Sequence, residues 1–336
     1  MWADATSRRL LLTVAPLMRA GGFAAWVLAP SYGAFAAGFV LWGVAGALES
    51  GALEALVYEE LDRLGAAARY PAVVGRATAL GTVASTAAIG LAAPVLAVGG
   101  FAAVGAASVL ACLAGAVVAA TLPEHRERPD PGDRPAGWRT GAAILRAGVV
   151  EVRSKPGLRG AVVLVGAVAS VWGALDEYVP LLAVDTGVAE ESVPLLFLVV
   201  YAGVTGGGLL GGVAARMTRH GLAAALVAAA AALALGALSR VPAGFVLLAA
   251  AFCGFQCITV VVETRLQSAI SGPSRATVTS LAGFGTELLV LGVFGAYAAG
   301  SVMASNATLF AGFAAVYLVV AAALLRGHGD PHRGTG

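Results

Sequence analysis

The chain has 336 residues, of which 59% are hydrophobic and only 12% are charged, and its mean hydropathy is +0.86. Soluble globular domains carry about a quarter charged residues, so the composition excludes a soluble protein and predicts an all-α polytopic membrane protein. The formal net charge is only +2. We expect the lipid bilayer as the main partner, no nucleic acid, and a monomer.

Apolar runs long enough to cross a bilayer follow one another along the chain. A spanning helix needs about 20 predominantly apolar residues. By that criterion ten spans are predicted, at 10–29, 32–53, 73–97, 99–121, 158–183, 193–214, 221–239, 242–262, 277–299 and 306–325.

A single long polar stretch, residues 122–157, divides these spans into a first half (1–121) with four spans and a second half (158–325) with six, followed by a tail (326–336). Several prolines keep its first part out of a helix. In its second part, apolar side chains repeat at helical spacing from Trp138 to Val152, with arginines on another face. We therefore predict a basic linker that ends in a helix lying at the membrane surface. A disordered linker is the alternative.

Positive charges are strongly biased to one side of the predicted spans. Apart from Arg19 and Arg240, the Lys and Arg residues fall in or near alternate connections, which places both termini and the linker in the cytoplasm. The predicted location is therefore the plasma or inner membrane, with multiple passes.

The two halves contain related segments. Arg76-Ala77-Thr78 and Arg275-Ala276-Thr277 each open a span, and Glu54 and Glu263 each close the span before it. Trp2 to Arg9 likewise corresponds to the end of Gly211 to His220. In this register the first two spans of the first half match the third and fourth of the second half. Two spans of a symmetric arrangement are then missing from the first half.

Trp2 to Arg9 and Gly211 to His220 resemble the loop between the second and third spans of the major facilitator superfamily, whose members have twelve spans and a long central cytoplasmic loop. Glu49 to Tyr58 further resembles the fourth-span ending of one group of exporters in that superfamily. The resemblance implies alternating access and export of small amphipathic molecules or drugs in exchange for protons, with no cofactor. The sequence has no phosphate loop, nucleophile elbow or histidine cluster, so we expect no enzymatic activity. The alternatives are a non-transporting remnant with a binding or assembly role, and an importer of a metabolite.

Charged residues within spans are the main candidates for function, because they are costly in a bilayer. Glu287 lies near the middle of its predicted span and is the candidate for proton coupling; a glutamate hydrogen-bonded to a neighbouring helix is the alternative. Arg19 and Glu49, on adjacent spans, are candidates for an ion pair that is either structural or part of a gate.

The remaining candidates lie near span ends, on helices of the second half and in the basic loops. Asp176 and Glu177 lie near the outer end of a span, as an acidic vestibule or simply a solvated helix end. The resemblance places Trp172, Tyr201 and Gln256 on helices that line or flank the central cavity, although packing alone also explains them. It also implies a cytoplasmic latch between Asp4 and Arg275. The gating candidates are Asp4, Arg8, Arg9, Arg76 and Arg275.

One predicted span carries glycine at every fourth position, Gly203, Gly207 and Gly211. Small residues at this spacing allow two helices to approach closely. We expect this span to pack tightly on a neighbour and, in a transporter, to slide along it.

Overall fold

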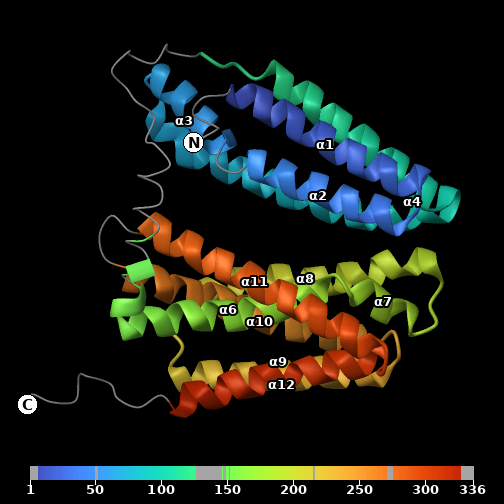
Figure 1. The fold of residues 1–336 in the computed structure, drawn as a ribbon, viewed down its shortest axis with the longest axis vertical. Helices are drawn as coiled ribbons and strands as arrows, with labels where there is room; N and C mark the ends of the chain where they lie inside the picture. The colour runs from blue at the N-terminus through green and yellow to red at the C-terminus, as the bar shows by residue number, and fades with distance from the viewer. Residues whose placement is uncertain are drawn as a thin grey trace, which may run out of the picture. The chain divides into compact units, whose positions relative to one another are not determined.

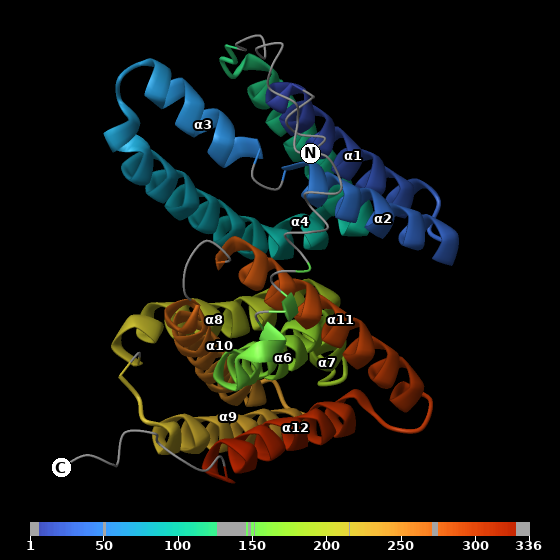
Figure 2. The ribbon, with the colours of Figure 1, turned by 60° about the vertical axis from the view of Figure 1, so that its left-hand side comes forward.

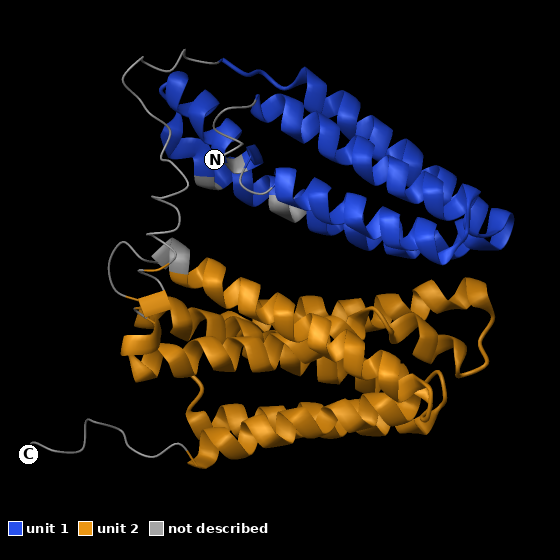
Figure 3. Ribbon diagram, in the orientation of Figure 1, with its two compact units in different colours: residues 1–138 blue, residues 139–336 orange. Residues whose placement is uncertain are grey.

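The computed structural model describes residues 7–49, 52–125, 146, 149–150, 152–214, 216–270 and 275–326. These residues are helical almost throughout, and no strand occurs among them. An all-helical chain is what the composition predicts, because helices pair their own backbone groups in a medium that offers no water. The chain divides into two compact units, residues 1–138 and 139–336 (Figure 3).

Unit 1 contains four helices and a short 3-10 turn. Helix α1 lies beside both α2 and the second half of α4, as Figures 1 and 2 show. Ser7 caps the start of α1, since its hydroxyl accepts a hydrogen bond from the Leu10 N–H at 3.1 Å. The elements are α1 (Arg8–Leu28), α2 (Tyr32–Glu49), α3 (Ala52–Arg63), η1 (Ala67–Arg69) and α4 (Tyr70–Thr121).

Helix α4 is two helices joined at a sharp bend. Its 52 residues are continuous except at Gly100, where φ is +60° and ψ is −163°. Only glycine adopts that conformation without severe strain. The bend divides α4 into the two spans predicted at 73–97 and 99–121. The described residues therefore hold nine apolar helices of spanning length, one of which contains two predicted spans.

Unit 2 is built around α10, which packs against α6, α8 and α9. Its core includes the stacked rings of Phe255 and Tyr317, whose centroids are 4.0 Å apart. The elements are α6 (Pro156–Asp176), α7 (Val179–Val184), η2 (Glu190–Ser192), α8 (Val193–Ala214), α9 (Arg219–Ser239), α10 (Gly244–Ala269), α11 (Arg275–Ser301) and α12 (Asn306–Arg326).

The glycines of α8 bring its backbone against α10. A Cβ built on Gly203 would lie 2.2 Å from the carbonyl oxygen of Ala249, and one on Gly207 would lie 2.2 Å from that of Cys253. A Cβ on Gly211 would meet the side chain of Val260. No side chain fits into these spaces, so the close approach expected of the glycine repeat is present in the structure.

Two predicted spans differ from the structure in their bounds. The predicted span 158–183 is α6 and the short α7, because α6 ends at Asp176 and a new helix begins at Val179, with Pro180 in its first turn. The predicted span 32–53 covers α2, described to Glu49, and the first two residues of α3, which was not predicted as a separate helix. Most of the predicted surface helix in the linker, including residues 138–145, lies outside the described residues. Of its apolar positions, Val152 is helical and buried.

Candidate functional site

Arg19 and Glu49 form the ion pair suggested by their positions on adjacent spans. The two guanidinium NH2 groups of Arg19 donate to the two oxygens of Glu49, at 2.9 and 2.6 Å. The guanidinium carbon also lies 5.4 Å from the ring centre of Trp42, a favourable cation–π position. Each charged side chain is a little under a third exposed. The pair therefore ties α1 to α2 with both charges partly removed from solvent.

A cavity of about 370 Å³ lies beside this ion pair, inside unit 1. Its wall is formed by α1, by the end of α2 and the start of α3, and by the second half of α4. Among the described residues, Arg19 and Glu49 are the only charged ones that line it. The remaining lining residues are Leu12, Pro16, Leu53, Ala111, Cys112, Gly115, Val118, Ala119 and Leu122. The cavity is thus apolar, with one neutralised pair of charges at its edge.

Polar contacts gather at the end of unit 1 that is predicted to be cytoplasmic. Glu124 accepts hydrogen bonds from the Ser7 hydroxyl and from the Arg8 N–H, the latter at 2.7 Å. A carboxylate is favourable there, because the N-terminus of α1 carries partial positive charge. The Arg8 guanidinium pairs with Glu59 on α3. Arg8, a gating candidate, thus connects elements within its own unit.

A second contact joins α3 to the segment after α4. Glu60 accepts hydrogen bonds from the backbone N–H of His125 at 2.7 Å, and its other oxygen lies 2.9 Å from Nδ1 of that ring. These contacts, the backbone one first, hold the pKa of Glu60 below its ordinary value. We call this set the polar clasp: Ser7, Arg8, Glu59, Glu60, Glu124 and His125.

The polar clasp could not be predicted from the sequence, because its partners are more than 50 residues apart. Of the other gating candidates, Arg9 and Arg76 are exposed. The proposed latch cannot be placed, since Asp4 and the side chain of Arg275 lie outside the described residues.

Glu287 lies near the middle of α11 on its exposed face. The opposite face of the helix is buried at Val278, Ala282, Val293 and Tyr297. Within the described residues no hydrogen bond or ion pair reaches the Glu287 carboxylate, so the alternative of a bond to a neighbouring helix is not seen. This residue therefore presents an unpaired carboxylate halfway along a membrane-spanning helix.

The aromatic and amide candidates differ in their surroundings. The indole N–H of Trp172 donates to the Thr259 hydroxyl at 3.1 Å, and its ring meets Phe252 edge to face, so this residue is part of the packed interior of unit 2. Tyr201 stacks on Phe197, one turn earlier in α8. Both Tyr201 and Gln256 are half-buried, which leaves part of each side chain available to a ligand.

The end of unit 2 that is predicted to face outward contains a polar network that was not predicted from the sequence. The Tyr297 hydroxyl donates to Asn306 Oδ1 at 2.7 Å, and Asn306 Nδ2 donates to Asp185 Oδ2 at 2.9 Å. The ring of Tyr178 stacks on that of Tyr297 with centroids 3.6 Å apart. Nearby on the chain, Asp176 is half-buried and the other vestibule candidate, Glu177, is exposed. The network ties α11 and α12 to the end of α7.

Among the comparisons with known proteins, only the comparison with solved structures found matches. No protein-family model matches the sequence, and no curated protein does. A crystal structure of a bacterial homologue of the human lysosomal transporter Spinster, inward-facing and unoccupied, matches with a TM-score of 0.59 and 17% identity, over 96% of this chain and 83% of that one. The chain has a fold of the major facilitator type.

The second solved structure, the E. coli fucose:proton symporter FucP, matches with a TM-score of 0.44 and 15% identity, over 95% of this chain and 84% of that one.

In the major facilitator fold, α6 to α12 supply the six spans predicted for the second half, with α6 and α7 together forming one of them. The helices of unit 1 supply the four predicted for the first.

Proposed function

We propose that this chain is a secondary active transporter that works by alternating access and exports small amphipathic molecules in exchange for protons. The fold supports a transporter, because the solved structure that resembles it is a transporter homologue in an inward-facing conformation. The division into two compact units also suits a mechanism in which two halves rock against each other.

Glu287 carries the proposal. A charged side chain near the bilayer centre costs about 2.5 to 3.5 kcal/mol on insertion scales, so such residues face a polar pathway or a partner. No partner for Glu287 occurs among the described residues, and the buried face of α11 lies on its other side. A carboxylate in this position can take up a proton on one side of the membrane and release it on the other.

Exchange follows if the substrate and the proton compete for this carboxylate. A cationic amphipathic molecule would bind the ionised form of Glu287, and protonation would expel it. Half-buried Tyr201 and Gln256 are the proposed contacts for the rest of the molecule, since aromatic faces attract organic cations. Asp176 and Glu177 would raise the local concentration of cations at the outer end.

Gating is proposed to use the basic residues at the end predicted to be cytoplasmic. Asp4 and Arg275 would close that end in the outward-open state. Arg9 follows Asp4 in the segment Trp2 to Arg9, and Arg76 is the counterpart of Arg275 in the register of the two halves. Asp4→Asn should shift the chain toward the inward-open state, seen as faster labelling of cysteines placed in the pathway. Unchanged labelling would refute the latch.

The proposed function is tested by export from cells. Cells that make the protein should accumulate less ethidium, an amphipathic cation, than cells with an empty vector. A protonophore should abolish the difference, because export would then lack its driving force. The same comparison with a neutral sugar tests the importer alternative. Equal accumulation of ethidium and of a panel of other amphipathic cations in both strains would contradict export of this class.

A further inference from the structure

The two units share a packing scheme that allows them to be compared position by position. In unit 1, α1 packs on α2 and on the second half of α4. In unit 2, α9 packs in the same way on α10 and on α12. The register from sequence agrees, since Glu54 corresponds to Glu263 and Arg76 to Arg275. Thus α2 is the counterpart of α10, and the first half of α4 is the counterpart of α11.

The counterparts differ in how far they are covered. Helix α10 also packs against α6 and α8, and α11 packs against α6. None of the described helices of unit 1 fills these two places. As a result, 50% of the most apolar stretch of α10 is buried, against 11% for α2.

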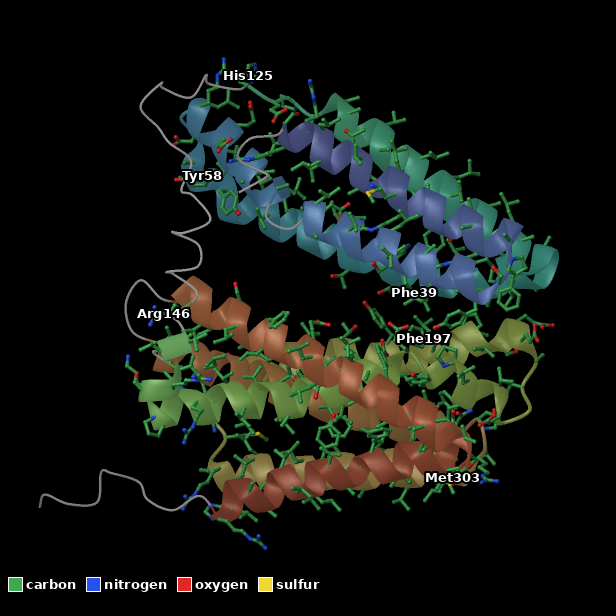
Figure 4. All side chains as sticks on the ribbon, in the orientation of Figure 1. Phe39, Tyr58, His125, Arg146, Phe197 and Met303 are labelled. Carbon is green, nitrogen blue, oxygen red and sulfur yellow. The ribbon has the colours of Figure 1, made fainter. Side chains whose placement is uncertain are left out.

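Individual residues on α2 show the same contrast. By the register, Val40 and Val44 correspond to Ala249 and Cys253, the residues of α10 against which the glycines of α8 pack. In unit 1 these valines are 65% and 42% exposed. Phe39, which projects from α2 away from α1 in Figure 4, is 62% exposed, although its counterpart in α10 is fully buried.

The first half of α4 is exposed on the corresponding face. Val83 is 66% exposed, whereas its counterpart Ala282 is 3% exposed. Val98 is 92% exposed, whereas its counterpart Tyr297 is 2% exposed. Apolar positions that are core in one unit are therefore surface in the other.

We propose that this surface, which we call the bare face, docks a membrane partner made of two antiparallel apolar helices with the chemistry of α6 and α8. The helix against α2 would carry small residues at every fourth position, because Gly203 and Gly207 make the equivalent contact on α10. The helix against α4 would be apolar. The bare face consists of Phe39, Val40, Val44, Val83 and Val98.

Three glycines of α2 leave open space in which a second helix could lie close. A Cβ built on Gly33, Gly43 or Gly46 would meet nothing within 4 Å. Glycines exposed in this way let a second helix backbone come close, as on α8. The proposal does not depend on transport, because docking is measured directly.

A disulfide cross-link tests the docking. The probe is a separate polypeptide of residues 156–214, containing α6 to α8, with Gly206→Cys as its single cysteine. In unit 2 a Cβ on Gly206 lies 3.9 Å from Sγ of Cys253. Because Val44 is the counterpart of Cys253, Val44→Cys in the full chain, with its three native cysteines replaced by alanine, should lie within disulfide reach of the probe.

Two controls match this pair. Ala45→Cys is on the same helix but is fully buried, so it should not react with the probe. A full chain with Gly206→Cys and native Cys253 should form the intramolecular disulfide, which verifies the geometry. The expected result is a mass increase by one probe for Val44→Cys and none for Ala45→Cys.

A spin label at Val44→Cys gives a second measurement that requires no bond formation. In vesicles, adding a probe whose helical content has been verified by circular dichroism should lower collisions of the label with oxygen. Unchanged collisions together with no cross-link would overturn the proposal. A disulfide-linked dimer of Val44→Cys chains that excludes the probe would also overturn it, since a second copy would then be the occupant.

Discussion

Arg19 on α1 and Glu49 on α2 meet through two parallel hydrogen bonds, of 2.9 and 2.6 Å. This arrangement fixes the relative rotation of the two helices as well as their distance, because the planar guanidinium matches the carboxylate in one orientation. It also lets two charges reside within spanning helices, since each neutralises the other.

Removing one partner should destabilise unit 1 more than removing both. Arg19→Met leaves Glu49 without its counter-charge, and we expect a loss of about 1 to 3 kcal/mol after allowing for partial exposure. The double variant Arg19→Met with Glu49→Gln should recover most of that loss. Thermal unfolding in detergent measures both. Losses that simply add in the double variant would show that the two side chains are not coupled.

The glycines of α8 should not tolerate a methyl group. Gly207→Ala places a Cβ 2.2 Å from the carbonyl oxygen of Cys253, and separating α8 from α10 should cost about 1 to 3 kcal/mol. Gly212→Ala is the matched control, because a Cβ there meets nothing within 4 Å. A Gly207→Ala protein that melts at the same temperature as the control would refute the close packing.

The hydroxyl of Tyr297 should contribute measurably to the stability of unit 2 at the end that is predicted to face outward. Tyr297→Phe keeps the stacking on Tyr178 but removes the hydrogen bond to Asn306, at a cost of about 1 kcal/mol. Tyr201→Phe serves as the control, since the Tyr201 hydroxyl makes no hydrogen bond within the described residues. Hydrogen exchange of the amides near Asn306 should rise only in Tyr297→Phe. Equal exchange in both variants would argue against the network.

The contact between Glu60 and His125 should weaken in acid. Because the pKa of Glu60 is lowered in the folded protein, this contact adds stability above the ordinary pKa of 4.5 and loses it as the pH falls through the lowered value. Glu60→Gln should therefore melt below wild type at pH 7, and the difference should shrink below pH 4.5. A difference that is constant with pH would mean that the Glu60 charge is not involved.

The sequence was most informative about features that repeat along a helix. Span length and hydropathy predicted the membrane helices, and the spacing of Gly203, Gly207 and Gly211 predicted where two of them approach. Both signals are local, because they follow from the rise and periodicity of a single helix. The pairing of Arg19 with Glu49 was also foreseen, since adjacent antiparallel spans leave few possible partners.

Contacts between distant segments could not be predicted. Glu124 caps a helix that begins more than 110 residues earlier, and Asp185 bonds to Asn306 across a similar separation. Nothing in either neighbourhood indicates its partner. The bend at Gly100 could be predicted only in part. The pair Gly99-Gly100 marks a break between spans, but the positive φ of Gly100 is visible only in the structure.

The most direct test of the account is to measure proton release in proteoliposomes that contain the purified protein, with pyranine trapped inside. Ethidium added outside should enter in exchange for internal protons, so pyranine should report a rise in internal pH with wild type. Glu287→Gln should reduce this signal at least about tenfold, because it removes the proposed coupling group. Ser280→Ala, exposed on the same helix, should behave as wild type. Proton release by Glu287→Gln at the wild-type rate would contradict the central role of this carboxylate.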